Sequence, residues 1–133
     1  MGKSNVDFVQ GIYAAFGKED VAAVMNSLAP DVEWLVNGRR SDYPTLGVWK
    51  GRAEVQKFFT LVGEHENFSE FTPKDFHVAG DVVFVLGHYA GTIATTGRAF
   101  ESDWLHMFTI KDGKVAQFRE FTDTAQFADA YRR

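Results

Sequence analysis

Hydrophobic and polar residues alternate through residues 84–122, and this pattern predicts three antiparallel strands joined by two tight turns. The second turn has Asp112-Gly113 at its tip, a dipeptide typical of two-residue hairpin loops. Because a two-residue loop fixes which residues face each other, Leu105 is expected opposite Glu120. These three strands are the part of the chain around which the other elements are expected to assemble.

Both faces of the three predicted strands are rich in apolar residues, so both are expected to be covered. If Thr95 and Thr96 form the tip of the first turn, His88 lies opposite Asp103. One predicted face carries Phe84, Leu86, His88, Asp103, Leu105, Met107, Phe118, Glu120 and Thr122. The other predicted face carries Val83, Val85, Tyr89, Trp104, His106, Phe108, Arg119 and Phe121.

Apolar residues at helical spacing predict three helices ahead of these strands. Ser4 or Asn5 is expected to cap the first helix, and Pro30 blocks continuation of the second. A third helix is expected to begin at Gly51, and Asp123 or Thr124 is expected to cap a short final helix. The buried stripes of the three helices are Phe8, Ile12, Ala15 and Phe16; Val21, Val24, Met25 and Leu28; and Val55, Phe58, Phe59 and Val62.

Residues 31–36 and 68–78 are expected to form further strands, with Pro73 marking an edge or a bulge. Residues 37–51 read as a long loop, which is either a binding loop or a surface loop pinned by its aromatic residues. The resulting order is ααβαββββ with a short terminal helix, an α+β layout. A strongly bent antiparallel sheet closed by helices would form a cone with a cavity at its open end.

Composition narrows the classes of function. The chain has 133 residues, enough for one domain with a substantial core, and 13 of them are Phe. Its net charge of −4 gives no basic footprint for nucleic acid, and the absence of Cys excludes disulfides and thiolate metal sites. No apolar run is long enough to cross a membrane, and the first five residues lack the hydrophobic core of a signal peptide, so a cytoplasmic protein is expected.

Three ionisable residues suggest acid–base chemistry. Glu120, His88 and Asp103 gather on one predicted face beside an apolar floor, where Glu120 would exchange protons and Asp103 would orient His88. Alternatively, Glu120 forms a structural salt bridge or lies at the solvent-exposed rim of the cavity. The alternative for His88 is a buried histidine whose hydrogen bonds serve only the structure. His106 is expected on the opposite face, in contact with solvent or a second subunit, although a bulge would move it inward. No spacing of His65 or His77 suggests a metal site.

Several motifs resemble the SnoaL-like domain family of the nuclear transport factor 2-like superfamily, which includes the ketosteroid isomerases. They are Ala29-Pro30-Asp31-Val32-Glu33-Trp34, Gly47-Val48-Trp49-Lys50-Gly51-Arg52 and Phe108-Thr109-Ile110-Lys111-Asp112-Gly113-Lys114-Val115. The resemblance covers nearly the whole chain and implies a single SnoaL-like domain over residues 1–133, with a cone-shaped α+β barrel fold. The superfamily contains isomerases, hydrolases, dehydratases, cyclases and binding domains, so its fold does not define one function.

The resemblance also shows which known mechanisms the chain lacks. The positions of the catalytic Asp, Tyr and Asp of ketosteroid isomerases are apolar here, at Trp34, near Ile12 and at or next to Leu105. Of the Asp-Arg-Asp set of limonene epoxide hydrolases, only the last acid has a counterpart, Glu120, while Ala90 and His88 lie near the other positions. Both comparisons imply that Glu120 lies inside the cavity.

Two functions of different classes remain open at the level of sequence. The first is a cofactor-independent enzyme of lyase, isomerase or cyclase type that moves protons on an apolar, oxygenated small molecule. The second is a small-molecule-binding or interaction domain without catalysis. A homodimer is expected to form through a sheet face that carries Trp104, Phe108, Phe121, Tyr89 and Val85. The walls of the cavity are expected to include Trp34, Tyr43, Trp49, Phe58, Phe84, Leu105 and Phe118.

Overall fold

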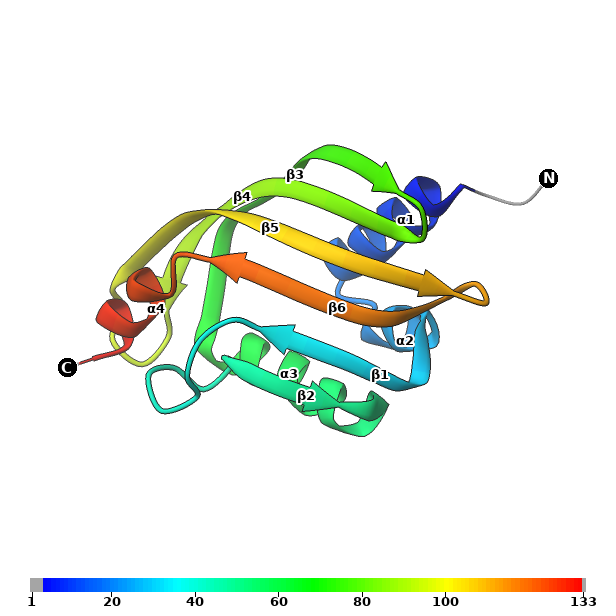
Figure 1. Cartoon of the computed structure of the whole chain (residues 1–133). Coiled ribbons are helices and arrows are strands. Elements are labelled where there is room, and N and C mark those ends of the chain that lie inside the picture. Colours follow the sequence, from blue (N-terminus) through cyan, green and yellow to red (C-terminus); the bar gives the residue numbers. More distant parts are fainter. Residues whose placement is uncertain (1–3, 133) are drawn as a thin grey trace.

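A computed structural model describes residues 4–132 and shows a curved six-stranded sheet with helices packed on its concave side (Figure 1). The helices are α1 (Asn5–Gly17), α2 (Val21–Asn26), α3 (Gly51–His65) and α4 (Thr124–Tyr131). The strands are β1 (Leu28–Val36), β2 (Gly47–Lys50), β3 (Glu66–Ala79), β4 (Val82–Ile93), β5 (Ala99–Lys111) and β6 (Lys114–Thr122). This arrangement confirms the predicted α+β fold class.

The sheet has the strand order β2-β1-β6-β5-β4-β3 and remains open, with β2 and β3 as its edges. Neighbouring strands are antiparallel except β1 and β6, which run parallel. The strand β2 lies inside the segment that was expected to be a long loop, which corrects that prediction. Pro73 lies in the edge strand β3 next to a register irregularity, as its missing N–H would require.

Side chains cap the helices where the sequence suggested. The Ser4 hydroxyl accepts a hydrogen bond from the Asp7 backbone N–H at 3.1 Å, and the Asp123 carboxylate accepts one from Ala125 at 3.2 Å. At the start of α3, the side chain of Glu54 accepts from the Lys50 backbone N–H at 2.8 Å. These contacts satisfy N–H groups that a helix leaves without internal partners.

The hairpin between β5 and β6 determines which residues point inward. Asp112 and Gly113 both have positive φ, as a tight two-residue turn requires, and Ile110 pairs with Val115 as predicted. One pair further along, the register shifts, because Thr109 pairs with Gln117. A bulge therefore moves the remainder of β6 by one residue relative to β5.

The concave face of β4 and β5 is the reverse of the predicted one. The register between these two strands is as predicted, with His88 opposite Asp103, but the buried side chains on them are Val83, Val85, Tyr89, Ile93, Phe100, Ser102, Trp104, His106, Phe108 and Ile110. Of the residues expected to form a dimer contact, Trp104, Phe108, Tyr89 and Val85 therefore lie in the core, and Phe121 alone lies on the outer face. The bulge explains why β6 nevertheless directs Phe118 and Glu120 inward.

Gly87 on β4 leaves room for a large side chain from the neighbouring strand β5. A Cβ atom added at Gly87 on β4 would collide with the indole ring of Trp104 and with the carbonyl oxygen of Thr72. The indole of Trp104 therefore occupies space that any other residue at position 87 would fill. Among residues 4–132, no helix is long and apolar enough to cross a membrane, and the predicted absence of a signal peptide concerns in part residues 1–3, which lie outside the described region.

Candidate functional site

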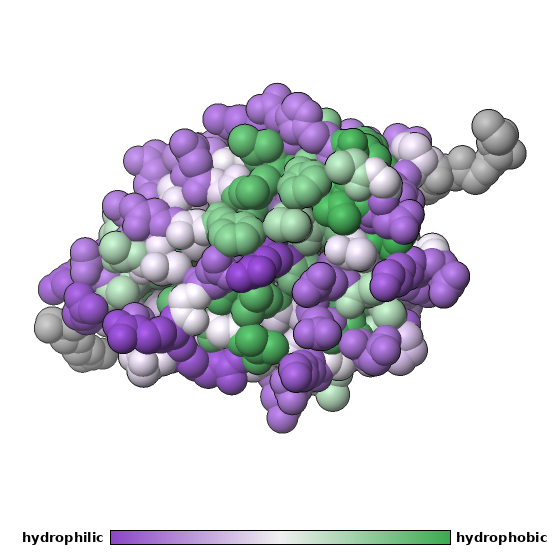
Figure 2. Space-filling model, viewed as in Figure 1, coloured by the Kyte–Doolittle hydropathy of each residue, from purple (hydrophilic) through white to green (hydrophobic). Residues whose placement is uncertain are grey.

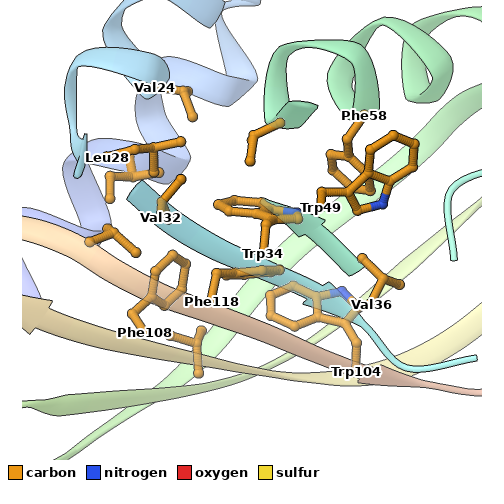
Figure 3. Packing of buried hydrophobic residues seen from close by; sticks show 14 of the residues in the cluster. Val24, Leu28, Val32, Trp34, Val36, Trp49, Phe58, Trp104, Phe108 and Phe118 are labelled. Carbon is orange, nitrogen blue, oxygen red and sulfur yellow. The ribbon is translucent and has the colours of Figure 1, made fainter. Parts of the chain in front are cut away.

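A pocket of about 80 Å³ lies between the concave face of the sheet and helices α1 and α3. Its walls are mostly aromatic, and its polar side chains are Tyr13, Thr45, Glu66, Tyr89, His106, Glu120 and Thr122. Figure 3 shows the packing beside it: Trp34 on β1 stacks on Phe118 from β6 at a ring distance of 3.8 Å, with Phe108 close by. A carboxylate at such a wall is in contact with little water.

The predicted ligand-contacting residues divide into three groups. Trp34, Phe58 and Phe118 line the pocket. Tyr43 and Trp49 are buried in the core but are not among the residues that line it. Phe84 and Leu105 lie on the outer face of the sheet, which corrects their predicted position.

The bulge places Glu120 directly opposite His106 rather than opposite Leu105. The Nε2 atom of His106 lies 2.6 Å from a carboxylate oxygen of Glu120, and its Nδ1 atom lies 2.6 Å from the Tyr13 hydroxyl of α1. The side chains of His106 and Glu120 are 5% and 15% exposed. Three residues from α1, β5 and β6 therefore form one buried, hydrogen-bonded chain at the pocket wall.

The protons in this chain can be assigned from chemistry. Burial raises the pKa of Tyr13 well above its usual range, and the negative charge of Glu120 raises it further. Tyr13 therefore keeps its proton and can donate it to Nδ1 of His106; with that tautomer, Nε2–H of the imidazole donates to the Glu120 carboxylate. The indole of Trp104 stacks on the His106 ring at 3.9 Å and fixes its plane.

A second carboxyl group, Glu66 at the start of β3, lines the same pocket. The hydroxyl of Tyr43 donates a hydrogen bond to it at 3.0 Å. Burial raises the pKa of Glu66 to about 8, and the charge of Glu120 raises it as well, although the hydrogen bond from Tyr43 lowers it. Glu66 is therefore largely a neutral acid at pH 7, in contrast to an ordinary carboxylate.

Tyr89 on β4 completes the polar part of the wall. Its hydroxyl donates to the Thr122 hydroxyl at 2.7 Å. Burial raises its pKa, and the neighbouring charge of Glu120 adds to the effect. Glu120 is thus the centre of negative charge that the surrounding hydroxyl groups experience.

His88 and Asp103 do not share a face with Glu120, which corrects the predicted trio. His88 lies on the outer face of the sheet, with Nδ1 2.9 Å from Asp103 and Nε2 3.1 Å from Glu101. The hydrogen bond that Asp103 accepts from His88 is the largest cause of the raised pKa of His88, and the hydrogen bond to Glu101 adds to it. The predicted pairing of His88 with Asp103 is confirmed, but the pair lies on the side of the sheet away from the pocket.

Sequence reasoning missed Tyr13 and Glu66 and placed His106 on the wrong face. A signal for the face was present, because the strand positions shared with His106 are Phe100, Ser102, Trp104, Phe108 and Ile110, whereas the alternate positions include Glu101, Asp103 and Lys111. Over the whole of β5, the side shared with His106 is therefore the more apolar one, which indicates the buried side. Tyr13 and Glu66 carried no such signal, since both lie where helical periodicity predicts ordinary helix residues.

Within residues 4–132, no group of three or more His, Cys, Asp or Glu side chains is arranged to hold a metal ion. The arrangement that the pocket does contain is a carboxylate, an imidazole and a phenol in series, with a neutral carboxylic acid elsewhere on the wall. Such a set can accept a proton, return it and donate hydrogen bonds to a ligand oxygen.

The architecture, a curved sheet folded around a helix-covered pocket, is that of the NTF2-like proteins. An NTF2-like protein from Burkholderia xenovorans LB400 has 31% sequence identity and a TM-score of 0.88, and the match covers 98% of this chain and 100% of that one. A second from Burkholderia thailandensis E264 also has 31% identity and a TM-score of 0.88, covering 99% and 100% of the two chains.

The chain belongs to the SnoaL-like domain family, whose sequence model matches residues 9–118. It is also similar to TerC in a structure co-crystallised with polyporic acid, with 26% identity, a TM-score of 0.83 and coverage of 95% of this chain and 96% of TerC. A comparison with curated proteins found no match. These similarities confirm the family resemblance seen in the sequence motifs.

Proposed function

We propose that the protein is a cofactor-independent enzyme that moves protons on an apolar, oxygenated small molecule, in a reaction of isomerase, lyase or cyclase type. The single observation that carries this proposal is the hydrogen-bonded chain Tyr13–His106–Glu120 at the wall of an aromatic pocket. Glu120 and His106 replace the predicted combination of Glu120 with His88 and Asp103.

Glu120 acts as the base in the proposed reaction. Its carboxylate takes a proton from a carbon next to a carbonyl group of the ligand, and the electron pair of the broken C–H bond moves to the carbonyl oxygen, forming an enolate. The proton then returns to a different carbon or to a leaving group. The aromatic wall strengthens this chemistry, because a water-poor environment does not stabilise the charged carboxylate as bulk water does.

His106 and Tyr13 position this base. The Nε2–H of His106 holds one carboxylate oxygen of Glu120 at 2.6 Å, which leaves the other oxygen for the ligand. Tyr13 fixes the imidazole in the tautomer that can donate to Glu120. The stacked Trp104 restricts the ring further. Positioning of this kind is how a rigid scaffold supports a single reactive group.

The class of ligand follows from the pocket and is supported by a relative. The lining is predominantly aromatic, which favours a ring-containing molecule. TerC, 26% identical to this chain, was co-crystallised with polyporic acid. The volume of about 80 Å³ is below the roughly 300–1,000 Å³ typical of ligand pockets, so a ligand as large as polyporic acid would require the aromatic side chains to move apart.

Proton exchange on a ketone probe tests the proposal. We expect the wild-type protein to accelerate exchange of the α-protons of α-tetralone in D₂O, measured by NMR, and Glu120→Gln to slow it by about a hundredfold or more. His88→Gln is the matched control, because His88 is also hydrogen-bonded to carboxylates but lies outside the pocket, and it should leave the rate unchanged. A wild-type protein that binds α-tetralone without accelerating exchange would favour the non-catalytic binding domain.

We also propose that the protein forms a homodimer through the outer face of the sheet. Partly exposed apolar residues lie side by side there through the strand pairing: Phe84 with Met107, Leu86 with Leu105, and Leu105 with Phe121. Figure 2 shows hydrophobic residues gathered on this face among hydrophilic ones. Leu86, 44% exposed, is the position for a test: Leu86→Arg should yield a folded monomer in sedimentation experiments. A wild-type monomer at micromolar concentration would contradict the dimer.

A further inference from the structure

Glu66 is a carboxyl group at the pocket wall that the proposed proton transfer does not use. It is the first residue of β3, directly after α3, and its carboxyl is enclosed by protein. Among the described residues, the hydroxyl of Tyr43 gives the one side-chain hydrogen bond to this carboxyl, and it engages a single oxygen. The pocket lining includes Glu66 but not Tyr43. Tyr43 thus holds the carboxyl from behind, on the side away from the pocket.

The charges around the pocket favour a neutral Glu66. The residues that line the pocket include neither Lys nor Arg, and their one potential cation, His106, is hydrogen-bonded to Glu120. A second ionised carboxylate would therefore be buried without a cationic partner and close to a like charge, which is costly. A neutral carboxylic acid avoids both costs and carries a proton that can be donated.

We propose that Glu66, held by Tyr43, donates a hydrogen bond to an acceptor oxygen of the ligand, so that the pocket recognises a small molecule with two oxygen functions. One oxygen function activates the carbon that Glu120 deprotonates, and the other is a carbonyl or oxyanion that faces Glu66. This inference rests on the proposed function in taking the pocket as the ligand site. It narrows the ligand to aromatic molecules such as hydroxyketones or hydroxyquinones.

The position of the proton on Glu66 follows from its partner. Tyr43 keeps its own proton, because burial and the adjacent Glu66 raise its pKa above the usual range. One oxygen of Glu66 therefore accepts from Tyr43, and the acid proton occupies the other oxygen, on the side that can meet a ligand. The pKa of Glu66, raised to about 8, agrees with this assignment.

Other titratable groups lie near this acid. Tyr89 of β4 and Glu120 of β6 interact with it electrostatically across the pocket. His65 of α3 and Tyr131 of α4 stack edge-on against Tyr43. Ionisation of Glu66 is the event expected near pH 8, because burial raises the pKa values of its neighbours Tyr43 and Tyr89 above their usual range.

A matched pair of probes tests the donor role. Acetophenone and ethylbenzene have nearly the same shape, and only acetophenone carries an acceptor oxygen. The preference is the ratio of the dissociation constants of ethylbenzene and acetophenone. We expect Glu66→Leu to reduce this ratio by about five- to tenfold, which corresponds to the loss of one hydrogen bond. Glu66→Gln keeps an N–H donor and should retain the preference. Glu64→Gln, which removes an exposed carboxylate two residues away, is the control and should match the wild type.

The pH dependence sharpens the same experiment. In the wild type, the preference for acetophenone should fall as pH rises through about 8, since the ionised carboxylate cannot donate a hydrogen bond, whereas Glu66→Gln should show no such fall. A preference that is equal in wild type and in a folded Glu66→Leu would overturn the proposal. The exchange of α-tetralone protons is a separate readout, so a donor role without proton exchange would contradict the proposed function alone.

Infrared spectroscopy gives a result that does not depend on ligand binding. The C=O absorption of a protonated carboxylic acid should be present at neutral pH in the wild type and in Glu64→Gln, and absent in Glu66→Gln. It should disappear in the wild type as pH rises past about 8. Identical carboxylic-acid absorption in wild type and Glu66→Gln would overturn the proposal, because Glu66 would then be ionised and unable to donate.

Discussion

The two faces of the sheet each place a histidine beside at least one carboxylate, and the two sites differ chiefly in burial. On the concave face, His106 lies between Tyr13 and Glu120, and the side chains of the His106–Glu120 pair are at most 15% exposed. On the outer face, His88 lies between Asp103 and Glu101, and Asp103 is 90% exposed. The residue types and distances are similar, but solvent screens the outer site.

This difference shows that a histidine beside an acid is not enough to define a candidate catalytic site. Burial of the pair is what distinguishes the inner site from a surface ion pair. Water stabilises the charges of the outer site and competes for its hydrogen bonds, so each contact there contributes little. The inner chain is surrounded by aromatic rings and has few alternative partners. Competition from water for its hydrogen bonds is therefore weak, and a fixed set of hydrogen bonds of this kind favours directed proton transfer.

The largest expected difference between the faces concerns stability. Trp104 on the inner side of β5 is 3% exposed, and Trp104→Ala should lower the free energy of unfolding by roughly 3–5 kcal/mol, because it leaves a cavity beside His106. Leu86→Ala on the outer side of β4 should cost less than about 1 kcal/mol in the monomer. Urea denaturation of both variants measures the contrast. Equal losses would contradict the assignment of the inner face.

The second prediction concerns how stability depends on pH. The pKa of Glu66 is raised from an ordinary value of 4.5 to about 8 on folding, so between these values the folded state binds a proton that the unfolded state has released. The contribution of Glu66 to the free energy of unfolding is therefore most favourable below pH 4.5. It decreases as pH rises, by up to about 1.4 kcal/mol per pH unit, until Glu66 ionises near pH 8.

Glu66→Gln isolates this contribution. Its free energy of unfolding should lack this decrease between about pH 5 and about pH 8, whereas Glu64→Gln should behave like the wild type. The free energy of unfolding of Glu66→Gln should therefore increase relative to that of the wild type as pH rises. A wild-type curve parallel to that of Glu66→Gln over this interval would mean that Glu66 has the same pKa in the folded and unfolded states.

The smallest expected effect belongs to the outer site. Asp103 is the largest cause of the raised pKa of His88, so Asp103→Asn should lower this pKa toward its ordinary value. The stability that the pair provides is full below the ordinary pKa of histidine and is lost as pH rises through the raised pKa. NMR titration in low and high salt measures the shift. A His88 pKa that Asp103→Asn leaves unchanged would contradict the contact.

The fold could be predicted largely from the sequence because its signals are local. The Asp112-Gly113 turn, the apolar stripes of the helices and the helix caps each depend on a few neighbouring residues. The short strand β2 was missed because its four residues, Gly47–Lys50, are too few to show a periodic pattern. The family resemblance added correct information on the inward direction of Glu120.

The candidate site could be predicted only in part, because one bulge decides it. The two-residue turn fixed the register at Ile110 correctly, but the register shift between Ile110 and Thr109 has no marker such as Gly or Pro in the sequence. Without that shift, Glu120 faces Leu105 and shares a side with His88. The contacts of Tyr13 with His106 and of Tyr43 with Glu66 join residues 93 and 23 positions apart, which periodicity cannot detect.

The most direct test of this account is the response of the two histidines to Glu120→Gln, followed by NMR of their ring nitrogens. The account predicts that the signals of His106 change in Tyr13→Phe, which removes the hydroxyl 2.6 Å from Nδ1, and in Glu120→Gln, which replaces the carboxylate 2.6 Å from Nε2 with a neutral amide. The signals of His88 should stay the same in both. A response of His88 to Glu120→Gln, with His106 unchanged, would contradict the register, the inner face and the proposed site together.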